Sequence, residues 1–251
     1  MITGIIASSV NVLAAFTDEF TPAGAFHPRW IQTRGTWVQN SGNAGCTSPV
    51  SAYPLLTFNA NTERVSVRTS QVGTSQFGWG VSFWVVDANN WWAAIIDRTA
   101  YSCIVGYTSG CCACGDSGSG NDCGCAGCYC CNCVTGAQVS FAGSCPQPSY
   151  GTCYSYNLRV LQSVGGTISN ISTTAIASGD IGNSLTVGYV QVVTNAAGQY
   201  TATAQMSTGG TIATATGTPS TARSRRHGLI LGPATEGTQA TTLERMIYSP
   251  V

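Results

Sequence analysis

Short runs of β-branched and aromatic residues, bounded by glycine, asparagine, aspartate and serine, recur along most of this 251-residue sequence. Such runs are typical of β-strands joined by turns. No long segment has apolar residues at the 3.6-residue spacing of an amphipathic helix. The pattern therefore predicts an all-β fold, and many short strands at regular spacing favour an antiparallel β-sandwich or jelly roll.

Alternation within the runs predicts which side chains enter the core. Val81, Phe83 and Val85 share one face of a strand. Residues 91–96 are apolar on both faces, which predicts a central strand covered on each side. Further strands are expected at residues 63–69, 158–162, 167–173, 185–193, 200–206, 227–231 and 243–248.

Two of these strands alternate clearly. In the strand at 63–69, Arg64 lies on the face opposite to Val65 and Val67, and in the strand at 158–162, Leu161 lies on the face opposite to Leu158 and Val160. Turns are predicted at Gly165-Gly166 and at residues 195–198.

Charge is scarce, and its distribution excludes several classes of protein. Charged residues make up 8% of the chain, and ten arginines balance ten acids without any lysine. A chain with no net positive charge is a poor candidate for nucleic-acid binding. The chain is 43% hydrophobic, so it is not disordered. No apolar run is long enough for a membrane-spanning helix. The uncharged N-terminus is interpreted as a strand or arm, with a secretory signal as the alternative.

Cysteine is concentrated in one segment. Twelve of the thirteen cysteines lie from Cys103 to Cys153, and only Cys46 lies outside. The strand pattern breaks over residues 104–152, where the remaining residues are mostly glycine, serine, alanine and asparagine. We therefore predict a single sandwich domain, residues 1–251, with a cysteine-rich insertion at 104–152. Such a segment has little apolar surface to bury and needs covalent or metal cross-links to hold a shape.

Two chemistries compete for these thiols. The preferred interpretation is a disulfide framework without any cofactor, which leaves Cys46 over. The candidate disulfide cysteines are Cys103, Cys111, Cys112, Cys114, Cys123, Cys125, Cys128, Cys130, Cys131, Cys133, Cys145 and Cys153. The alternative is an all-cysteine zinc or iron site, because pairs of thiolates two residues apart converge on one ion. Its candidate ligands are Cys111, Cys114, Cys125, Cys128, Cys130 and Cys133.

The acids do not form a catalytic pattern. A glycosidase needs two carboxylates facing each other across a cleft. Asp18 and Glu19 are adjacent and would point to opposite sides of a strand, while Asp87 and Asp97 fall at a turn and a strand end. We therefore expect no catalytic residues and a protein that is not an enzyme.

The remaining polar motifs are equally weak as catalytic signals. His27 and His227 have no recognisable partner for nucleophilic catalysis, and no serine-hydrolase elbow, zinc-protease or phosphate-loop motif is present. Asp87, Asn89 and Asn90 carry oxygens suited to calcium. An Asx turn explains the same three residues and is the preferred interpretation.

Tryptophan and arginine supply the candidate binding residues. Trp84, Trp91 and Trp92 lie in strongly apolar runs and are assigned to the core. Trp79 follows Gly78 at the start of a strand and is the tryptophan expected to be exposed to a ligand.

Three arginines close together form the second candidate. Arg223, Arg225 and Arg226 could meet an acidic glycan or an acidic subunit, with a solvated loop as the alternative. We expect no metal ion at the candidate binding residues, Trp79 and the three arginines.

A series of motifs in a fixed order points to a known group of proteins. The motifs are FTDEF at 16–20, RW at 29–30, GTW at 35–37, GVSF at 80–83, DANNWW at 87–92, NLRVL at 157–161, RHGL at 226–229 and LERMIY at 243–248. Their order resembles the concanavalin A-like, laminin-G-like jelly rolls, and most closely those of phage structural and tail proteins.

The resemblance implies a function as well as a fold. It implies a non-enzymatic structural or recognition protein of a virion, either a tail-associated adhesin or a head decoration protein. Its partners would be other virion proteins, further copies of the same chain and a host-surface glycan. The alternative is a secreted carbohydrate-binding module of lectin type.

Overall fold

The computed structural model describes residues 14–47, 53–72, 78–107, 148–176, 187–206, 208–219, 221, 223–232 and 242–251. Within these residues the fold contains fifteen strands and no helix. None of them forms a helix that could span a membrane. The chain divides into two units, Met1–Thr99 with Ser155–Val251, and Ala100–Tyr154.

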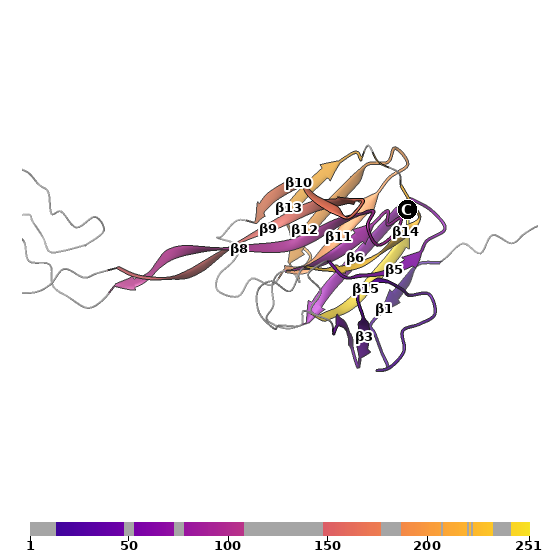
Figure 1. Cartoon of the computed structure of the whole chain (residues 1–251), viewed down its shortest axis with the longest axis horizontal. Coiled ribbons are helices and arrows are strands. Elements are labelled where there is room, and N and C mark those ends of the chain that lie inside the picture. Colours follow the sequence, from indigo (N-terminus) through magenta and orange to yellow (C-terminus); the bar gives the residue numbers. More distant parts are fainter. Residues whose placement is uncertain are drawn as a thin grey trace, which may run out of the picture. The chain divides into compact units, whose positions relative to one another are not determined.

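Two antiparallel sheets form the fold (Figure 1). The eight-stranded sheet runs in the order β13 (Thr211–Gly217), β12 (Tyr200–Met206), β11 (Val187–Thr194), β6 (Val65–Val72), β15 (Thr242–Pro250), β4 (Asn43–Cys46) and β3 (Trp37–Asn40), and β1 (Phe16–Asp18) also pairs with β15. The seven-stranded sheet runs in the order β10 (Thr167–Ile176), β9 (Pro148–Val164), β8 (Trp91–Tyr107), β7 (Trp79–Phe83), β14 (Arg226–Leu231), β5 (Leu55–Asn59) and β2 (Ile31–Arg34). The predicted antiparallel β-sandwich is confirmed, whereas its assignment to the concanavalin A-like jelly rolls stays a prediction.

Aromatic contacts join the two sheets through the core. Phe58 of β5 packs edge-on against Tyr248 of β15 at 5.1 Å between ring centroids. Phe83 of β7 lies 5.4 Å from Tyr200 of β12. All four rings are almost completely buried. Edge-to-face and tilted aromatic packing adds stabilisation beyond the burial of area, so these pairs help to set how the sheets face each other.

Strand β8 is covered on both faces, as the sequence predicts for residues 91–96. One face places Trp92 and Ile96 in the core between the sheets. The opposite face places Trp91 and Ile95 in a second buried cluster together with Leu161 of β9. A central strand of this kind needs apolar residues at consecutive positions, which explains why its sequence does not alternate.

One predicted face is wrong. Val81 and Phe83 enter the core between the sheets, but Val85 belongs to the second cluster. Strand β7 ends at Phe83, and Trp84 takes a left-handed backbone conformation with φ of 48°. This conformation interrupts the two-residue period, so the side chain of Val85 moves to the other face. Trp84 itself is buried, as predicted.

Asp18 connects two of the sequence motifs. Its Oδ1 accepts a hydrogen bond from the backbone N–H of Phe20 at 2.8 Å, and its Oδ2 accepts one from the indole N–H of Trp30 at 2.7 Å. Trp30 is only 7% exposed. The carboxylate thus satisfies a buried indole and fixes the segment that follows β1.

We expect Asp18→Ala to lower the free energy of unfolding by about 2–3 kcal/mol, because the indole N–H of Trp30 would stay buried without an acceptor. Urea denaturation followed by tryptophan fluorescence measures this loss. Glu19→Ala is the matched control, since its ion pair with Arg245 is exposed and should contribute less than about 1 kcal/mol. Equal losses from the two substitutions would contradict the anchoring role of Asp18.

The second unit carries the described ends of β8 and β9. Cys103 lies on β8 and Cys153 on β9, but their side chains are outside the described part of the chain. Among the side chains of this unit that the structure describes, Tyr101 is exposed by 50%, Ile104 by 49% and Tyr150 by 65%.

Several predictions on the cysteine-rich segment are left open. The other candidate cysteines, from Cys111 to Cys145, and residues 1–13 of the expected N-terminal arm lie outside the described residues. The choice between disulfides and a zinc or iron site therefore stays a prediction. The extent of the insertion at 104–152 within one domain also stays a prediction. Cys46, which was expected to be left over, is half-buried against the core.

Candidate binding pocket

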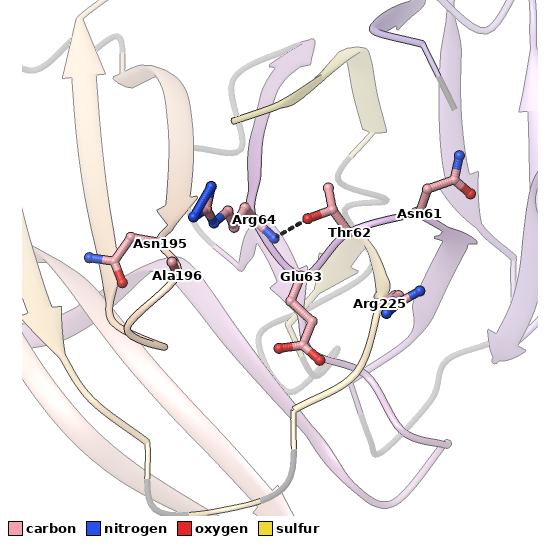
Figure 2. A pocket seen from close by; sticks show the side chains of 7 residues that line it. All are labelled: Asn61, Thr62, Glu63, Arg64, Asn195, Ala196 and Arg225. Carbon is pink, nitrogen blue, oxygen red and sulfur yellow. Dashed lines mark hydrogen bonds between the residues drawn. The ribbon is translucent and has the colours of Figure 1, made fainter. Parts of the chain in front are cut away.

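A pocket of about 340 Å³ opens where three loops of the first unit meet. The loops follow β5, β11 and β13, and thus come from both sheets. Figure 2 shows Asn195 and Ala196 on one side of the pocket, Asn61 and Arg225 on the other, and Glu63 between them. Its lining residues are Asn61, Thr62, Glu63, Arg64, Asn195, Ala196 and Arg225.

A buried threonine holds the first loop in place. The hydroxyl of Thr194, at the end of β11, donates to the carbonyl oxygen of Glu63 at 2.6 Å and accepts from the N–H of Val65 at 2.9 Å. Thr62 accepts from the backbone N–H of Arg64 at 3.1 Å (Figure 2). The backbone of residues 62–65 is therefore fixed, which orients the side chains of Glu63 and Arg64.

The second loop is the turn that the sequence predicts at residues 195–198. The N–H of Gly198 donates to the carbonyl of Asn195, and the side-chain oxygen of Asn195 accepts from the N–H of Gln199, both at 3.0 Å. Gly198 has a φ of 76°, and a methyl group there would overlap the guanidinium of Arg223. The positive φ favours glycine at this position, whereas the exposed side chain of Arg223 could move away from a methyl group.

The third segment is fastened through Ser224. Its hydroxyl donates to the carbonyl oxygen of Val85 at 2.6 Å and accepts from the N–H of Arg226 at 3.1 Å. The carbonyl oxygen of Arg225 accepts from the N–H of Ala60 at 2.7 Å. These bonds hold Arg225 beside the first loop of the pocket.

The three predicted arginines do not act as one patch. Arg225 lines the pocket. Arg223 lies against Gly198, with its Nη1 at 3.9 Å from a carboxylate oxygen of Glu63. The Nε of Arg226 donates to the side-chain oxygen of Asn59 at 3.2 Å and is not part of the lining.

The pocket carries excess positive charge. Glu63 is the one acid among its lining residues, and it already faces Arg223. Arg64 and Arg225 are exposed, and within the described residues no acceptor pairs with either guanidinium. Two unneutralised guanidinium groups beside amides and a hydroxyl make an environment suited to a small anionic, hydroxyl-bearing ligand. The sequence interpretation missed Arg64, whose only signal was its outward position in an alternating strand.

The expectation for Trp79 is wrong. Trp79 is completely buried, and its strand β7 lies between β8 and β14 in the seven-stranded sheet. It pairs with Ile96 on one side and Leu231 on the other. Its side chain belongs to the main core cluster, so a position at the start of a strand does not expose it. Trp79 therefore offers no face to a ligand.

Asp87 forms the Asx turn that the sequence favours. One carboxylate oxygen accepts from the N–H of Asn89 at 2.7 Å, and both oxygens accept from the side-chain amide of Asn90 at 2.9 Å. These hydrogen bonds hold the pKa of Asp87 below its ordinary value. The amide nitrogen of Asn90 thus donates to the carboxylate, while its oxygen accepts from the N–H of Gly165 at 2.9 Å.

The other acids discussed above also have structural partners. Asp97 pairs with Arg159, and Glu19 pairs with Arg245. Both pairs lie outside the pocket lining. The opposed carboxylates of a glycosidase are not found among these described acids.

The similarities between this chain and known proteins are weak. No protein-family description matches the sequence, and no curated protein matches it. The CBM2 module of the evolved Dit of Lactobacillus casei BL23 phage J-1 has a TM-score of 0.46 and 8% identity, over 93% of each chain. Protein SO2946 of Shewanella oneidensis MR-1, of unknown function, has a TM-score of 0.48 and 9% identity, over 99% of this chain and 95% of that one. Similarities at this level carry no conclusion about what this chain binds.

Proposed function

We propose that this protein is a non-enzymatic recognition protein of a virion, either a phage tail-associated adhesin or a head decoration protein. The observation that carries the proposal is the pocket, which three loops build on a rigid sandwich and which contains two guanidinium groups without a described partner. Loops on a rigid scaffold are where proteins most often place their binding residues.

A binding role is also supported by how the described acids are used. Asp18 anchors Trp30, Asp87 closes a turn, and Asp97 pairs with Arg159. Each carboxylate has a structural task that would conflict with proton transfer to a substrate. This supports a protein that binds without turnover.

The virion part of the proposal rests on the order of the sequence motifs and on the exposed surface of the second unit. Tyr101, Ile104 and Tyr150 are all about half exposed or more. Tyr101 and Ile104 lie on β8 and Tyr150 on its neighbour β9. Exposed aromatic and aliphatic side chains on neighbouring strands are typical of surfaces that contact another subunit.

A secreted carbohydrate-binding module is the second candidate, because the same pocket would serve it. The two candidates differ in assembly. A virion protein works as one of many copies, whereas a binding module works as a monomer.

We expect the purified chain to form a defined oligomer in light scattering coupled to size-exclusion chromatography. Tyr101→Ser together with Ile104→Ser should shift it towards the monomer, because both changes remove exposed apolar contact area. Val86→Ser is the matched control, since Val86 is 46% exposed but lies in the first unit. A monodisperse monomer that binds sugar would favour the secreted module instead.

A further inference from the structure

We infer that the pocket binds a sugar that carries a carboxylate, such as a uronic acid, through Arg64 and Arg225. This inference rests on the proposed recognition function and gives the chemical class of its ligand.

The charge of the pocket argues for an anion. Arg64 comes from the loop before β6 and Arg225 from the segment before β14, so two separate elements contribute an arginine to the lining of the same cavity (Figure 2). Both are exposed, and within the described part of the chain neither is neutralised. A guanidinium matches a carboxylate with two parallel hydrogen bonds, and such charge-assisted bonds are stronger than neutral ones.

The other lining groups argue for a sugar ring beside the carboxylate. Thr62 and Asn195 bring a hydroxyl and an amide. Thr62 accepts from Arg64, and Asn195 bonds Gln199 through its oxygen and one N–H. The hydroxyl hydrogen of Thr62 and the second amide N–H of Asn195 are left to donate to sugar hydroxyls. The carboxylate of Glu63 only accepts hydrogen bonds, and a sugar hydroxyl can donate one to it. The pocket therefore offers acceptors as well as donors, a mixture that a simple inorganic anion would not use.

The size and the remaining charge argue against an acidic protein segment. A volume of about 340 Å³ is at the small end of the range of about 300–1,000 Å³ for small-molecule sites. Glu63 would repel the second and third carboxylates of an acidic peptide that ran across the pocket. One carboxylate surrounded by hydroxyls fits this arrangement better than a run of carboxylates.

Titration calorimetry on the full chain tests the inference, with glucuronate, glucose, acetate and a hexaglutamate peptide as probes. We expect glucuronate to bind best, and Arg64→Gln or Arg225→Gln to weaken it by about tenfold or more, because each removes a charge-assisted pair. The matched control is Arg245→Gln, which removes an arginine outside the pocket and should leave the affinity unchanged. Since Arg64 and Arg225 are exposed, the variants should unfold at the wild-type temperature.

Other outcomes would overturn the inference. Equal binding of glucose and glucuronate, with no effect of either substitution, would show that the carboxylate is not recognised. Tighter binding of hexaglutamate would identify an acidic protein partner, and equal binding of acetate would exclude recognition of the sugar ring. Absence of binding to all four probes would also overturn it. The oligomeric mass tests the virion proposal independently. An oligomer that does not prefer glucuronate would contradict the ligand class alone, whereas a monomer would contradict the virion function.

Discussion

Acid should destabilise this protein through His227, and His227→Leu should remove much of that sensitivity. His227 of β14 is completely buried, and neither ring nitrogen has a hydrogen-bond partner among the described residues. Burial lowers the pKa of His227 from 6.5 to about 3. The folded state therefore keeps the ring neutral at a pH where the unfolded chain binds a proton.

The sign follows from which state binds the proton. Between pH 6.5 and pH 3 the unfolded state holds more protons at this residue, so stability falls as the pH is lowered through this window. Because one pKa unit corresponds to about 1.4 kcal/mol, lowering the pH from about 7 to about 4.5 should cost about 2.5 kcal/mol at His227 alone. Above pH 6.5 this contribution disappears.

The measurement compares urea unfolding of the wild type and of His227→Leu at both pH values. On acidification the free energy of unfolding of the variant should fall by about 2.5 kcal/mol less than that of the wild type. The variant should also be more stable at neutral pH, because the substitution removes two buried nitrogens that have no hydrogen-bond partner among the described residues. Leu229→Met is the control, since Leu229 lies on the same face of β14 and does not titrate. An equal loss in wild type and His227→Leu would show that His227 does not couple folding to pH.

Gly80→Ala should severely destabilise the seven-stranded sheet. Gly80 of β7 pairs with Ile95 of β8 and Ile230 of β14. A methyl group at this position would overlap the carbonyl oxygen of Ala94 and approach the Cα of Ile95 to 2.8 Å. Backbone atoms in paired strands cannot rotate away, so the strands themselves would have to separate.

We expect Gly80→Ala to lower the free energy of unfolding by about 3 kcal/mol or more, or to prevent folding, as severe overpacking does. Gly210→Ala is the matched control, because its methyl group would meet only the flexible end of Met206 at 2.9 Å. The control should cost less than about 1 kcal/mol. Denaturation midpoints measure both effects, and a Gly80→Ala protein as stable as the Gly210→Ala protein would contradict the close packing.

The sequence alone placed most strands and much of the core. Leu158 and Val160 face the core between the sheets while Leu161 faces the second cluster, as their alternation predicts. Gly165 and Gly166, interpreted as a hairpin turn, both have positive φ. Local patterns suffice here because strand period, turn conformation and burial act on neighbouring residues.

Two predictions are wrong, the exposure of Trp79 and the face of Val85, because the strand pattern does not encode the environment of either side chain. Trp79 is buried in the main core cluster, and its strand lies between β8 and β14, an arrangement that no local pattern encodes. Val85 changes face because Trp84 adopts positive φ, a conformation that bulky residues rarely take.

The pocket shows the same division between sequence and structure. The sequence by itself determined the arginine-rich segment, the turn at Asn195 and the alternation that places Arg64 on an outward face. Only the tertiary structure brought Arg64, Asn195 and Arg225 to one cavity, because β6 pairs with β11 and β14 pairs with β5. Periodicity reports which face a residue occupies, whereas strand order depends on pairings between segments more than a hundred residues apart, and these are settled by the packing of the whole core.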